Sequence, residues 1–403
     1  QGGDIEGLRL KLADGYFDTL HTNTLWISPI TQNPKDAWGL WNQGGPVSTF
    51  SGYHGYWPIS NIKPDHRFAS PEELHLFLDD AHANEKNVLL DYVANHVHEL
   101  HPVFQKHPNW ATNKYTADGR LNTQLWDEER LTTWFDTFMP TLELRNDTVA
   151  ELMSDSALVW ITEYDFDGFR HDATKHIPMN FTRLLTQKIR AASDDHVYQI
   201  GETYGSDELI ASYVGSGKVD AQFNFNLYDA AFEAFTQEGA TFDRLRKALE
   251  SSLTYYGHHH LMGNISGNQD KPRFSSMASG HLSMSEDSKL AGWTREIPEP
   301  TERGYRKMAA MHAFNIAVPG IPILYYGDEI ALHGGNDPDN RKMMPFNFSD
   351  RQQQLFDRIA RLNENRNNIM ALNYGSTTVH QPDPHVLIIV RKYMEQEVRF
   401  FFN

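Results

Sequence analysis

The feature that most constrains the fold is a repeated order along the chain, a helical segment followed by a short apolar run. A capping box formed by Ser70 and Glu73 predicts the start of one such helix, and it ends near Ala83. Successive parallel strands need a crossover connection of this kind, usually a helix. The order appears three times, in a helix from Pro71 followed by NVLLDYV at 87–93, a helix at 147–163 followed by DGFRHDA, and a helix at 178–192 followed by VYQIGE.

Four more apolar runs bring the strand candidates to seven: TLWISPI at 24–30, AQFNFNL, LMGNISGNQD and GIPILYYGDE. Strands in this number, with helices between most of them, approach the eight strands of a TIM barrel. The opening GGDIEGLRLKL has the pattern of a loop that enters a helix. We therefore predict an α/β fold, a TIM (β/α)8 barrel, whose first strand precedes Gln1.

Two segments break the alternation. Residues 97–143 are rich in Trp, His, Asn and Asp and are too long for a simple loop, which predicts a small domain inserted after the third barrel strand. Near the end of the chain, HVLIIVRKY and EVRFFF have the pattern of antiparallel strands. The predicted organisation is a barrel over 1–96 and 144–369, an inserted domain over 97–143, and the start of a C-terminal β-domain over 370–403.

Charge and composition exclude several classes of partner and chemistry. The 53 acidic residues outnumber the 36 basic ones, for a formal charge of -17, which argues against nucleic acid and anionic membrane surfaces as partners. The absence of cysteine excludes disulfides, thiol catalysis and cysteine-ligated zinc. No run approaches the roughly 18 apolar residues of a transmembrane segment, and no signal-peptide pattern opens the sequence.

Ionisable side chains gather where the predicted strands end. In GFRHDATKH, Arg170 and Asp172 share one face of the strand while His171 points to the other. Each such group alone is better explained as a strand-end ion pair. Four strand ends with such groups favour one shared site at the barrel mouth: Asp91, Asn95 and His96; Arg170, Asp172, Lys175 and His176; Glu202; Asn268, Gln269 and Asp270.

Three of these groups, Asp172, Glu202 and Asp270, are carboxylates. Two carboxylates about 5 Å apart can perform retaining glycoside hydrolysis, in which one attacks the anomeric carbon and the other protonates the leaving oxygen. A neighbouring arginine is expected to keep the nucleophile ionised.

The motifs resemble those of the α-amylase family of glycoside hydrolases, glycoside hydrolase family 13, and they occur in the family's order. DYVANH resembles the end of the third strand, GFRHDATKH the fourth, GETY the fifth and GNQD the seventh. MPTLEL at 139–144 resembles the motif that closes the inserted domain, and YHGYW at 53–57 resembles a substrate-stacking loop. GIPILYYGDE followed by GGNDPDNR resembles the eighth strand and the loop behind it.

The resemblance implies a role for each matching residue. Asp172 would be the nucleophile, Glu202 the general acid and base, and Asp270 the carboxylate that holds sugar hydroxyls. Arg170 would orient Asp172, His96 would bond a sugar hydroxyl and Tyr56 would stack beneath the reacting sugar. The other substrate-binding positions are Lys175 and His176 on the leaving-group side, Asn268 and Gln269 beside Asp270, and Asp337 with Arg341 as a clamp towards the non-reducing end.

Two positions depart from the family's pattern. Gln269 stands where the family generally has a second active-site histidine, and glutamine can donate a hydrogen bond but cannot carry charge. In MPTLEL, family members more often have Asp or Lys at Thr141 and Asn or Asp at Glu143. Weaker transition-state stabilisation or an altered substrate and linkage preference are the expected consequences.

The predicted function is retaining, endo-acting hydrolysis of α-1,4-glucans such as starch or maltooligosaccharides, because exo-acting α-glucosidases of the family usually lack the Lys175–His176 pair. The alternatives within the family are an exo-acting α-glucosidase, a neopullulanase or cyclodextrinase, and a transglycosylase. A carbohydrate-binding protein on an inactive scaffold is a further alternative, weakened by the retention of all three carboxylates. We also predict an extracellular or periplasmic location.

The sequence allows two hypotheses about a bound metal ion, a catalytic metal and a structural calcium ion. His96, His98 and His101 lie close together in the sequence, which keeps a metal-dependent hydrolase open, although His101 falls in a predicted loop. A structural calcium ion is the stronger expectation, because Asn95 resembles a calcium ligand of the family and calcium prefers oxygen donors.

Overall fold

The computed structural model describes residues 3–42 and 47–403. Its centre is a parallel five-stranded sheet in the order β1-β4-β5-β6-β7, beside a parallel pair β8-β9. A parallel bridge from Phe223, which follows β7, to Gly263 at the start of β8 connects the two groups. The strands are β1 (Thr24–Ile27), β4 (Asn87–Tyr92), β5 (Gly168–His171), β6 (Tyr198–Gly201), β7 (Ala221–Gln222), β8 (Gly263–Ile265) and β9 (Ile321–Ile323).

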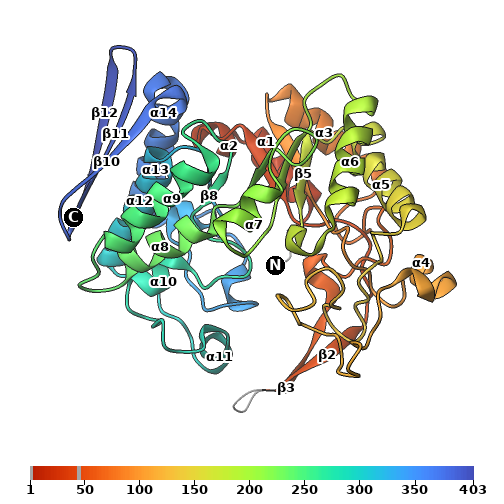
Figure 1. Cartoon of the computed structure of the whole chain (residues 1–403). Helices are drawn as coiled ribbons and strands as arrows, with labels where there is room; N and C mark the ends of the chain where they lie inside the picture. The colour runs from red at the N-terminus through yellow and green to blue at the C-terminus, as the bar shows by residue number, and fades with distance from the viewer. Residues whose placement is uncertain (1–2, 43–46) are drawn as a thin grey trace.

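Helices surround these strands as a TIM barrel requires (Figure 1). The capping box at Ser70 and Glu73 is confirmed, because each side chain bonds the backbone of the other at the start of α3. The larger helices are α1 (Ile5–Ala13), α3 (Pro71–Ala83), α5 (Asp147–Thr162), α6 (Met179–Ala192), α8 (Phe225–Thr236), α9 (Asp243–Tyr256), α12 (Glu302–Ala317) and α13 (Asp350–Asn368). The shorter ones are α2 (Tyr16–Thr19), α4 (Pro102–Lys106), α7 (Asp207–Ser212), α10 (Phe274–Ala278), α11 (Ser288–Thr294) and α14 (Met370–Tyr374), with 3-10 turns η1 (Gly52–His54), η2 (Pro108–Trp110), η3 (Thr174–His176), η4 (Asp328–Ile330) and η5 (Asp339–Arg341).

The buried apolar side chains form two clusters that match the two halves of the barrel. One cluster packs β1, β4 and β5 against α3, α5 and α6, with Phe77, Trp160 and Phe169 among its fully buried members. The other packs α8, α9 and α12 together around Phe235 and Phe314. Burying such side chains supplies most of the favourable free energy of folding, about 1.5–3 kcal/mol for each large one. The barrel frame that holds the strand ends is therefore set by these two clusters.

Residues 97–143 leave the barrel after β4 and return before α5. Apart from the short α4 and η2, the segment is held by isolated bridges, and two of them, His96 to Thr141 and Ala111 to Leu142, pair its ends. The described part of this segment therefore contains no ladder of strands of its own. Its irregular backbone lies at the carboxyl ends of β4 and β5, beside the polar residues of the predicted site.

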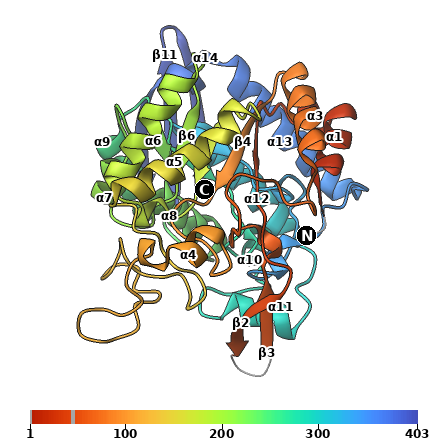
Figure 2. The same cartoon turned by 90° about the vertical axis from the view of Figure 1, so that its right-hand side faces the viewer.

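One feature that the sequence pattern did not predict is an antiparallel hairpin, β2 (Ala37–Asn42) with β3 (Val47–Ser51). It projects from the loop after β1, and α11 lies beside its end in both views (Figures 1 and 2). Alternation in AWGLWN and VSTFS is short and interrupted by Gly39, which explains why the pattern did not indicate strands.

The C-terminal residues form a three-stranded antiparallel sheet, β10 (Ser376–Asp383), β11 (Val386–Tyr393) and β12 (Gln396–Phe402). The antiparallel pairing of HVLIIVRKY with EVRFFF is confirmed, and β10 adds a third strand that the pattern missed. This sheet lies far from the β2–β3 hairpin (Figure 1).

The structure differs from the predicted barrel strands at AQFNFNL and agrees with the prediction at the start of the chain. The apolar run AQFNFNL was expected to be a strand, but only Ala221 and Gln222 are, because Phe225 already begins α8 and buries its ring in the core. The opening loop that enters a helix is confirmed by α1, which Asp4 caps. Within the described residues no ladder joins β9 to β1, and the position of the first barrel strand before Gln1 stays a prediction.

Within the same residues, no helix combines the length and the apolar character that a membrane crossing needs.

Candidate active site

Arg170 is the centre of the site. It lies on β5, a strand whose four residues are all buried, in register with Asp91 on β4. Its Nη1 donates to Asp91 Oδ1 at 2.7 Å and to Asp172 Oδ1 at 2.9 Å, and its Nη2 lies 2.9 Å from Glu202 Oε2. One buried guanidinium thus holds three carboxylates from three neighbouring strand ends.

The crowding of these groups changes their protonation. Burial raises the pKa of Asp172 well above its usual value, Glu202 and Asp91 add to the rise, and Arg170 only partly opposes it. Burial raises the pKa of Asp91 in the same way. The expectation that Arg170 keeps Asp172 ionised far below neutral pH is therefore wrong for the free site. Arg170 is shared among three carboxylates, and burial of Asp91 and Asp172 outweighs its effect on each of these two.

Glu202 follows β6 directly and is fixed by the turn after Asp172. The backbone N–H of Ala173 donates to Glu202 Oε2 at 3.0 Å, and the N–H of Glu202 donates to Thr174 Oγ1 at 3.1 Å. A Cβ on Gly201 would lie 2.7 Å from that Thr174 oxygen and 2.5 Å from the Gln222 amide, which explains the glycine in GETY. Glu202 and Asp172 are thus placed by one shared turn.

A second network approaches Asp91 from the other side. Tyr56 donates from its hydroxyl to Asp91 Oδ2 at 2.7 Å, and the Trp26 indole donates to the same oxygen at 3.2 Å. Gln269 Nε2 donates to the Tyr56 hydroxyl oxygen at 2.7 Å. Gly55 makes this approach possible, because it has a φ of +89° and a Cβ there would lie 2.1 Å from the Pro29 carbonyl oxygen. The side-chain amide of Gln269, which stands at the position of the family's second histidine, therefore donates a hydrogen bond to Tyr56.

Asp270 lies at the rim, with 56% of its side chain exposed, and the side-chain oxygen of Asn268 accepts from its backbone N–H at 3.0 Å. Although more than half of the side chain meets solvent, partial loss of surrounding water and the nearby Glu202 raise the pKa of Asp270 to about 6. Arg341 Nη2 lies 3.5 Å from Asp270 Oδ1 and opposes that shift. Asn268 thus acts on the backbone turn that presents Asp270.

Asp337 and Arg341, the predicted clamp, form an ion pair. Arg341 Nε lies 3.0 Å from Asp337 Oδ1, and the Tyr53 hydroxyl donates to the same carboxylate oxygen at 2.6 Å. Arg341 also donates from Nε to the Gln269 carbonyl at 3.1 Å. The clamp therefore joins the loop of Asp270 to the loop that follows β1.

The inserted segment supplies the opposite wall. His96 donates from Nε2 to the Tyr56 carbonyl at 3.1 Å and stacks on Phe135 at 4.2 Å, and burial lowers the pKa of His96 to about 4, which keeps it neutral. His176 donates from Nδ1 to the Arg130 carbonyl at 2.7 Å, and Lys175 pairs with Asp127 at 2.5 Å. Every predicted site residue considered so far thus lies in one connected set of contacts.

The histidines of NHVHELH do not form a metal site. Each of His98 and His101 accepts a hydrogen bond at 3.1 Å from the backbone N–H two residues further on, of Leu100 and Val103 respectively. Both side chains therefore stabilise the turn in which they lie. His171, predicted on the packing side, is confirmed there by a 3.0 Å contact with Gln199. Over the described residues no group of three or more His, Cys, Asp or Glu side chains could hold a metal ion.

The surroundings of Asn95 do not fit the expected calcium ion. Asn95 Oδ1 is buried without a hydrogen-bond partner, which leaves one oxygen for a ligand. Its amide nitrogen faces Thr141 Oγ1 at 3.4 Å, at the position where the family more often has a charged residue. Calcium takes six to eight oxygens, usually with carboxylates among them. A single amide oxygen beside a threonine does not provide that set, and we derive no role for calcium.

Chelation tests this reading. A resident ion present at 100 times its Kd would stabilise the fold by about 2.7 kcal/mol, and removing it would lower Tm. We expect EDTA and added CaCl2 to leave Tm, measured by differential scanning fluorimetry, unchanged within error. A drop of several degrees with EDTA that calcium reverses would contradict the reading, and Asn95→Ala would then show whether Asn95 is the ligand.

Some residues of the site were missed by sequence reasoning as functional groups. Trp26 bonds into the Arg170 network through Asp91, and Asp127, Trp126 and Arg130 shape the wall around His176. Asp91 was predicted at the barrel mouth without a role, and the structure makes it a direct partner of Arg170. The residues of the inserted segment gave no such signal, because an irregular backbone has no period from which a facing side can be read.

The fold and the site together define a barrel glycosidase scaffold with four carboxylates at its mouth, Asp91, Asp172, Glu202 and Asp270. A family model for the alpha-amylase catalytic domain matches residues 1–369, and the chain belongs to this family.

Relatives of known name agree with this assignment. A cyclomaltodextrin glucanotransferase of Paenibacillus macerans is 26% identical over 97% of this chain and 53% of that protein, and a cyclomaltodextrinase of Geobacillus thermopakistaniensis is 26% identical over 96% of this chain and 59% of that protein. The solved alpha-amylase of Geobacillus thermoleovorans, complexed with acarbose, superposes with a TM-score of 0.81 at 26% identity, covering 99% of this chain and 80% of that one. The chain thus spans little more than half the length of the curated relatives it matches.

Proposed function

We propose that the protein is a retaining glycoside hydrolase that cleaves internal α-1,4 bonds of an α-glucan. The observation that carries this proposal is the contact of Arg170 with both Asp172 and Glu202, each at 2.9 Å. Two carboxylates held by one guanidinium favour the spacing of about 5 Å that retaining enzymes use over the wider spacing of inverting ones.

In the first step Glu202 protonates the glycosidic oxygen while Asp172 Oδ attacks the anomeric carbon, and the C–O bond to the leaving chain breaks. A covalent glycosyl ester on Asp172 results. In the second step Glu202, now a carboxylate, takes a proton from water, the water oxygen attacks the anomeric carbon, and Asp172 leaves as a carboxylate. The proton that Glu202 gave to the leaving chain is thus replaced from water.

The carboxylates must divide their roles in this mechanism. Burial raises the pKa of Asp172 and of Asp91, and Arg170 opposes both shifts. The first step needs Asp172 as a carboxylate and Glu202 as an acid, and pairs of carboxyls with divided roles are typical of glycosidases.

The remaining residues position the sugar. Asp270, open to solvent at the rim, is placed to accept hydroxyl protons of the reacting ring. Gln269 can offer a hydrogen bond but no charge, and it is already bonded to Tyr56. We therefore infer a transition state with less charge stabilisation than the family's usual histidine gives.

The ends of the site support endo action. On the leaving-group side, the Asp127 partner of Lys175 has 90% of its side chain exposed, and Asp270 beside the reacting sugar is more than half exposed. A site open in this way can hold a substrate that continues on the leaving-group side. An α-glucan is accordingly the proposed substrate, and the extracellular or periplasmic location stays a prediction.

Transglycosylation is the second candidate, and the glucanotransferase name of a relative favours it. Transfer differs from hydrolysis only in the acceptor that attacks the ester on Asp172. Exclusion of water decides between the two outcomes.

A chromatographic time course on starch, pullulan, cyclodextrin and isomaltooligosaccharides separates these candidates. We expect mixed maltooligosaccharides from starch early in the reaction. Glucose alone from short oligosaccharides would indicate an exo-acting α-glucosidase. Cyclic or lengthened products would indicate a transferase, and preferred cleavage of cyclodextrin or pullulan would indicate a cyclodextrinase or neopullulanase.

A further inference from the structure

Two tryptophans meet outside the catalytic residues. Trp41 on β2 and Trp293 on α11 stack with ring centroids 5.8 Å apart and planes at 26°. Trp293 keeps 40% of its surface exposed, and Trp41 is half-buried. The first ring comes from the loop after β1 and the second from the loop after β8, and the two elements lie together below the barrel in both views (Figures 1 and 2).

Neither ring belongs to the two apolar clusters of the fold. A half-exposed pair of large aromatic rings is unusual without a partner, because each ring gains free energy when an apolar face covers it. A wholly structural explanation is available, since an isolated hairpin such as β2–β3 is marginally stable alone and the contact with α11 would secure it. That explanation and a binding role predict different responses to substitution.

Contacts connect the tryptophan pair to the catalytic site. Lys289 on α11 places Nζ 5.6 Å from the centre of the Trp41 ring and 3.9 Å from Asp337 Oδ2. Asp337 pairs with Arg341 at 3.0 Å, and Arg341 reaches Asp270 at 3.5 Å. The pair is therefore connected to the catalytic site through Lys289 and the Asp337–Arg341 clamp.

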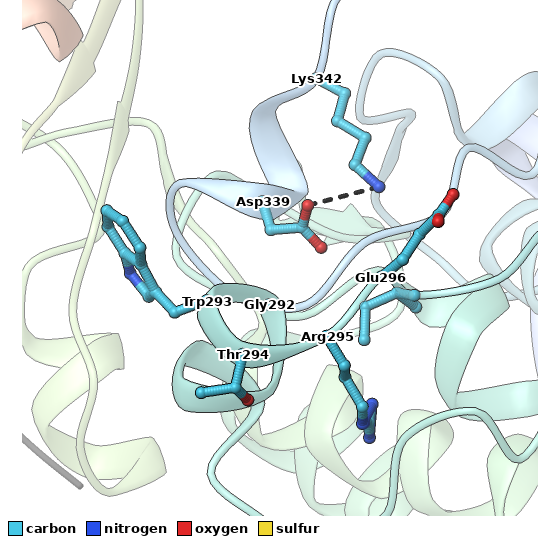
Figure 3. Close-up of a pocket in the computed structure, with 8 residues that line it drawn as sticks. Gly292, Trp293, Thr294, Arg295, Glu296, Asp339 and Lys342 are labelled. Atoms are coloured by element: carbon cyan, nitrogen blue, oxygen red, sulfur yellow. Dashed lines mark ion pairs between the residues drawn. The ribbon is translucent and has the colours of Figure 1, made fainter. Parts of the chain in front are cut away.

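An open hollow of about 570 Å³ adjoins Trp293. Charged groups also line it: Asp339 and Lys342 pair at 3.3 Å, the Glu296 carboxylate lies beyond Lys342, and Arg295 extends downwards (Figure 3). The Trp293 indole extends away from these groups (Figure 3), so a sugar chain that stacks on the indole can continue over a surface of fixed donors and acceptors. The lining carries acidic and basic side chains together, so it favours a neutral ligand over a strongly charged one.

We propose that Trp41, Trp293 and this hollow form an additional binding site for an α-glucan, occupied by the part of a long chain that extends past Asp337. The proposal rests on the proposed function for the identity of the sugar. A short substrate that fills only the catalytic residues would not reach the tryptophans. A long one would bind more tightly and gain in kcat/KM.

The test compares substrates of increasing length in the purified protein. We expect Trp293→Ala, and the double variant Trp41→Ala/Trp293→Ala, to lower the ratio of kcat/KM on amylose to kcat/KM on maltotriose roughly tenfold. The fall should come from a higher KM for amylose, with kcat unchanged. Trp293→Phe should restore most of the ratio, because it retains an aromatic face. Tyr374→Ala, which removes an exposed aromatic of α14 near the C-terminal sheet, is the matched control and should leave the ratio unchanged.

A second readout measures binding without turnover. In the Asp172→Asn background, affinity electrophoresis in amylose should show weaker retardation when Trp293 is alanine. An unchanged length ratio with unchanged retardation would overturn the proposal, and so would a large fall in Tm with the ratio intact, which indicates a structural clamp. If the unsubstituted protein cleaves no α-glucan, the proposed function fails instead, and retardation in amylose alone then decides whether this site binds glucan.

Discussion

Asp172→Asn is expected to lower kcat/KM on soluble starch by about 10⁴-fold or more, because the covalent intermediate cannot form without the carboxylate. Asparagine has the same shape, and its side-chain oxygen can still accept from Arg170 Nη1, which holds Asp172 at 2.9 Å. The variant should therefore bind glucan but release almost no reducing ends. Reducing-end assays and calorimetric titration with a maltooligosaccharide measure the two properties.

The same substitution should not destabilise the fold. It removes one of the three carboxylates that share Arg170, and with it part of their repulsion, so Tm should be equal or higher at neutral pH. Asp155→Asn is the control, because it makes the same change on the surface, where Asp155 pairs with Lys188 and is 67% exposed. Residual activity above a tenth of the unsubstituted level would contradict the assignment of Asp172 as nucleophile. Loss of both activity and glucan binding would point to damage of the whole site.

The barrel and the catalytic strand ends were predictable because they depend on period. Alternation in GFRHDATKH assigns Arg170 and Asp172 to one face and His171 to the other, and the structure places His171 against Gln199, away from the carboxylates. The capping box at Ser70 is equally local, since both of its bonds join residues three apart. Short-range rules of this kind do not require knowledge of what lies across the barrel.

The predictions that failed, and the contacts that were missed, depend on residues that are distant in the sequence. Arg170 was expected to keep Asp172 ionised, and the sequence did not show that Asp91 and Glu202 would share the same guanidinium. The bond from Gln269 to Tyr56 joins residues 213 positions apart. The stacking of Trp41 on Trp293 likewise joins two loops that no pattern connects. Electrostatic balance and contacts between loops therefore required the structure.

Arg170→Met should produce the largest loss of stability that a single change in this site can give. The methionine fits the apolar stem of arginine but leaves Asp91, Asp172 and Glu202 without the cation that contacts all three at 2.7–2.9 Å. Breaking such a buried pair costs about 3–5 kcal/mol, since unpaired charge stays in a medium that solvates it poorly. Chemical denaturation at pH 7 measures the free energy of unfolding.

The pH dependence of this loss identifies its cause. Burial raises the folded-state pKa of Asp91 and Asp172 above the value of about 3.9 in an unfolded chain, so above that pH the folded state binds more protons than the unfolded state. Stability from these two groups is therefore complete below about pH 4 and is lost as the pH rises through their folded pKa values. Arg170 opposes both shifts, and its removal should make the decline with pH steeper and extend it to higher pH.

Two companion variants separate charge from packing. Asp91→Asn added to Arg170→Met should recover part of the lost stability by removing one unpaired carboxylate. Arg9→Met, which breaks the partly exposed pair of Arg9 with Asp80 at 2.8 Å, should cost less than about 1 kcal/mol. If Arg170→Met is too unstable at pH 7, denaturation at pH 5 still compares the variants, because protonation relieves the repulsion there. Equal losses at pH 5 and pH 8, with no recovery from Asp91→Asn, would mean that Arg170 stabilises the fold by packing rather than by its charge.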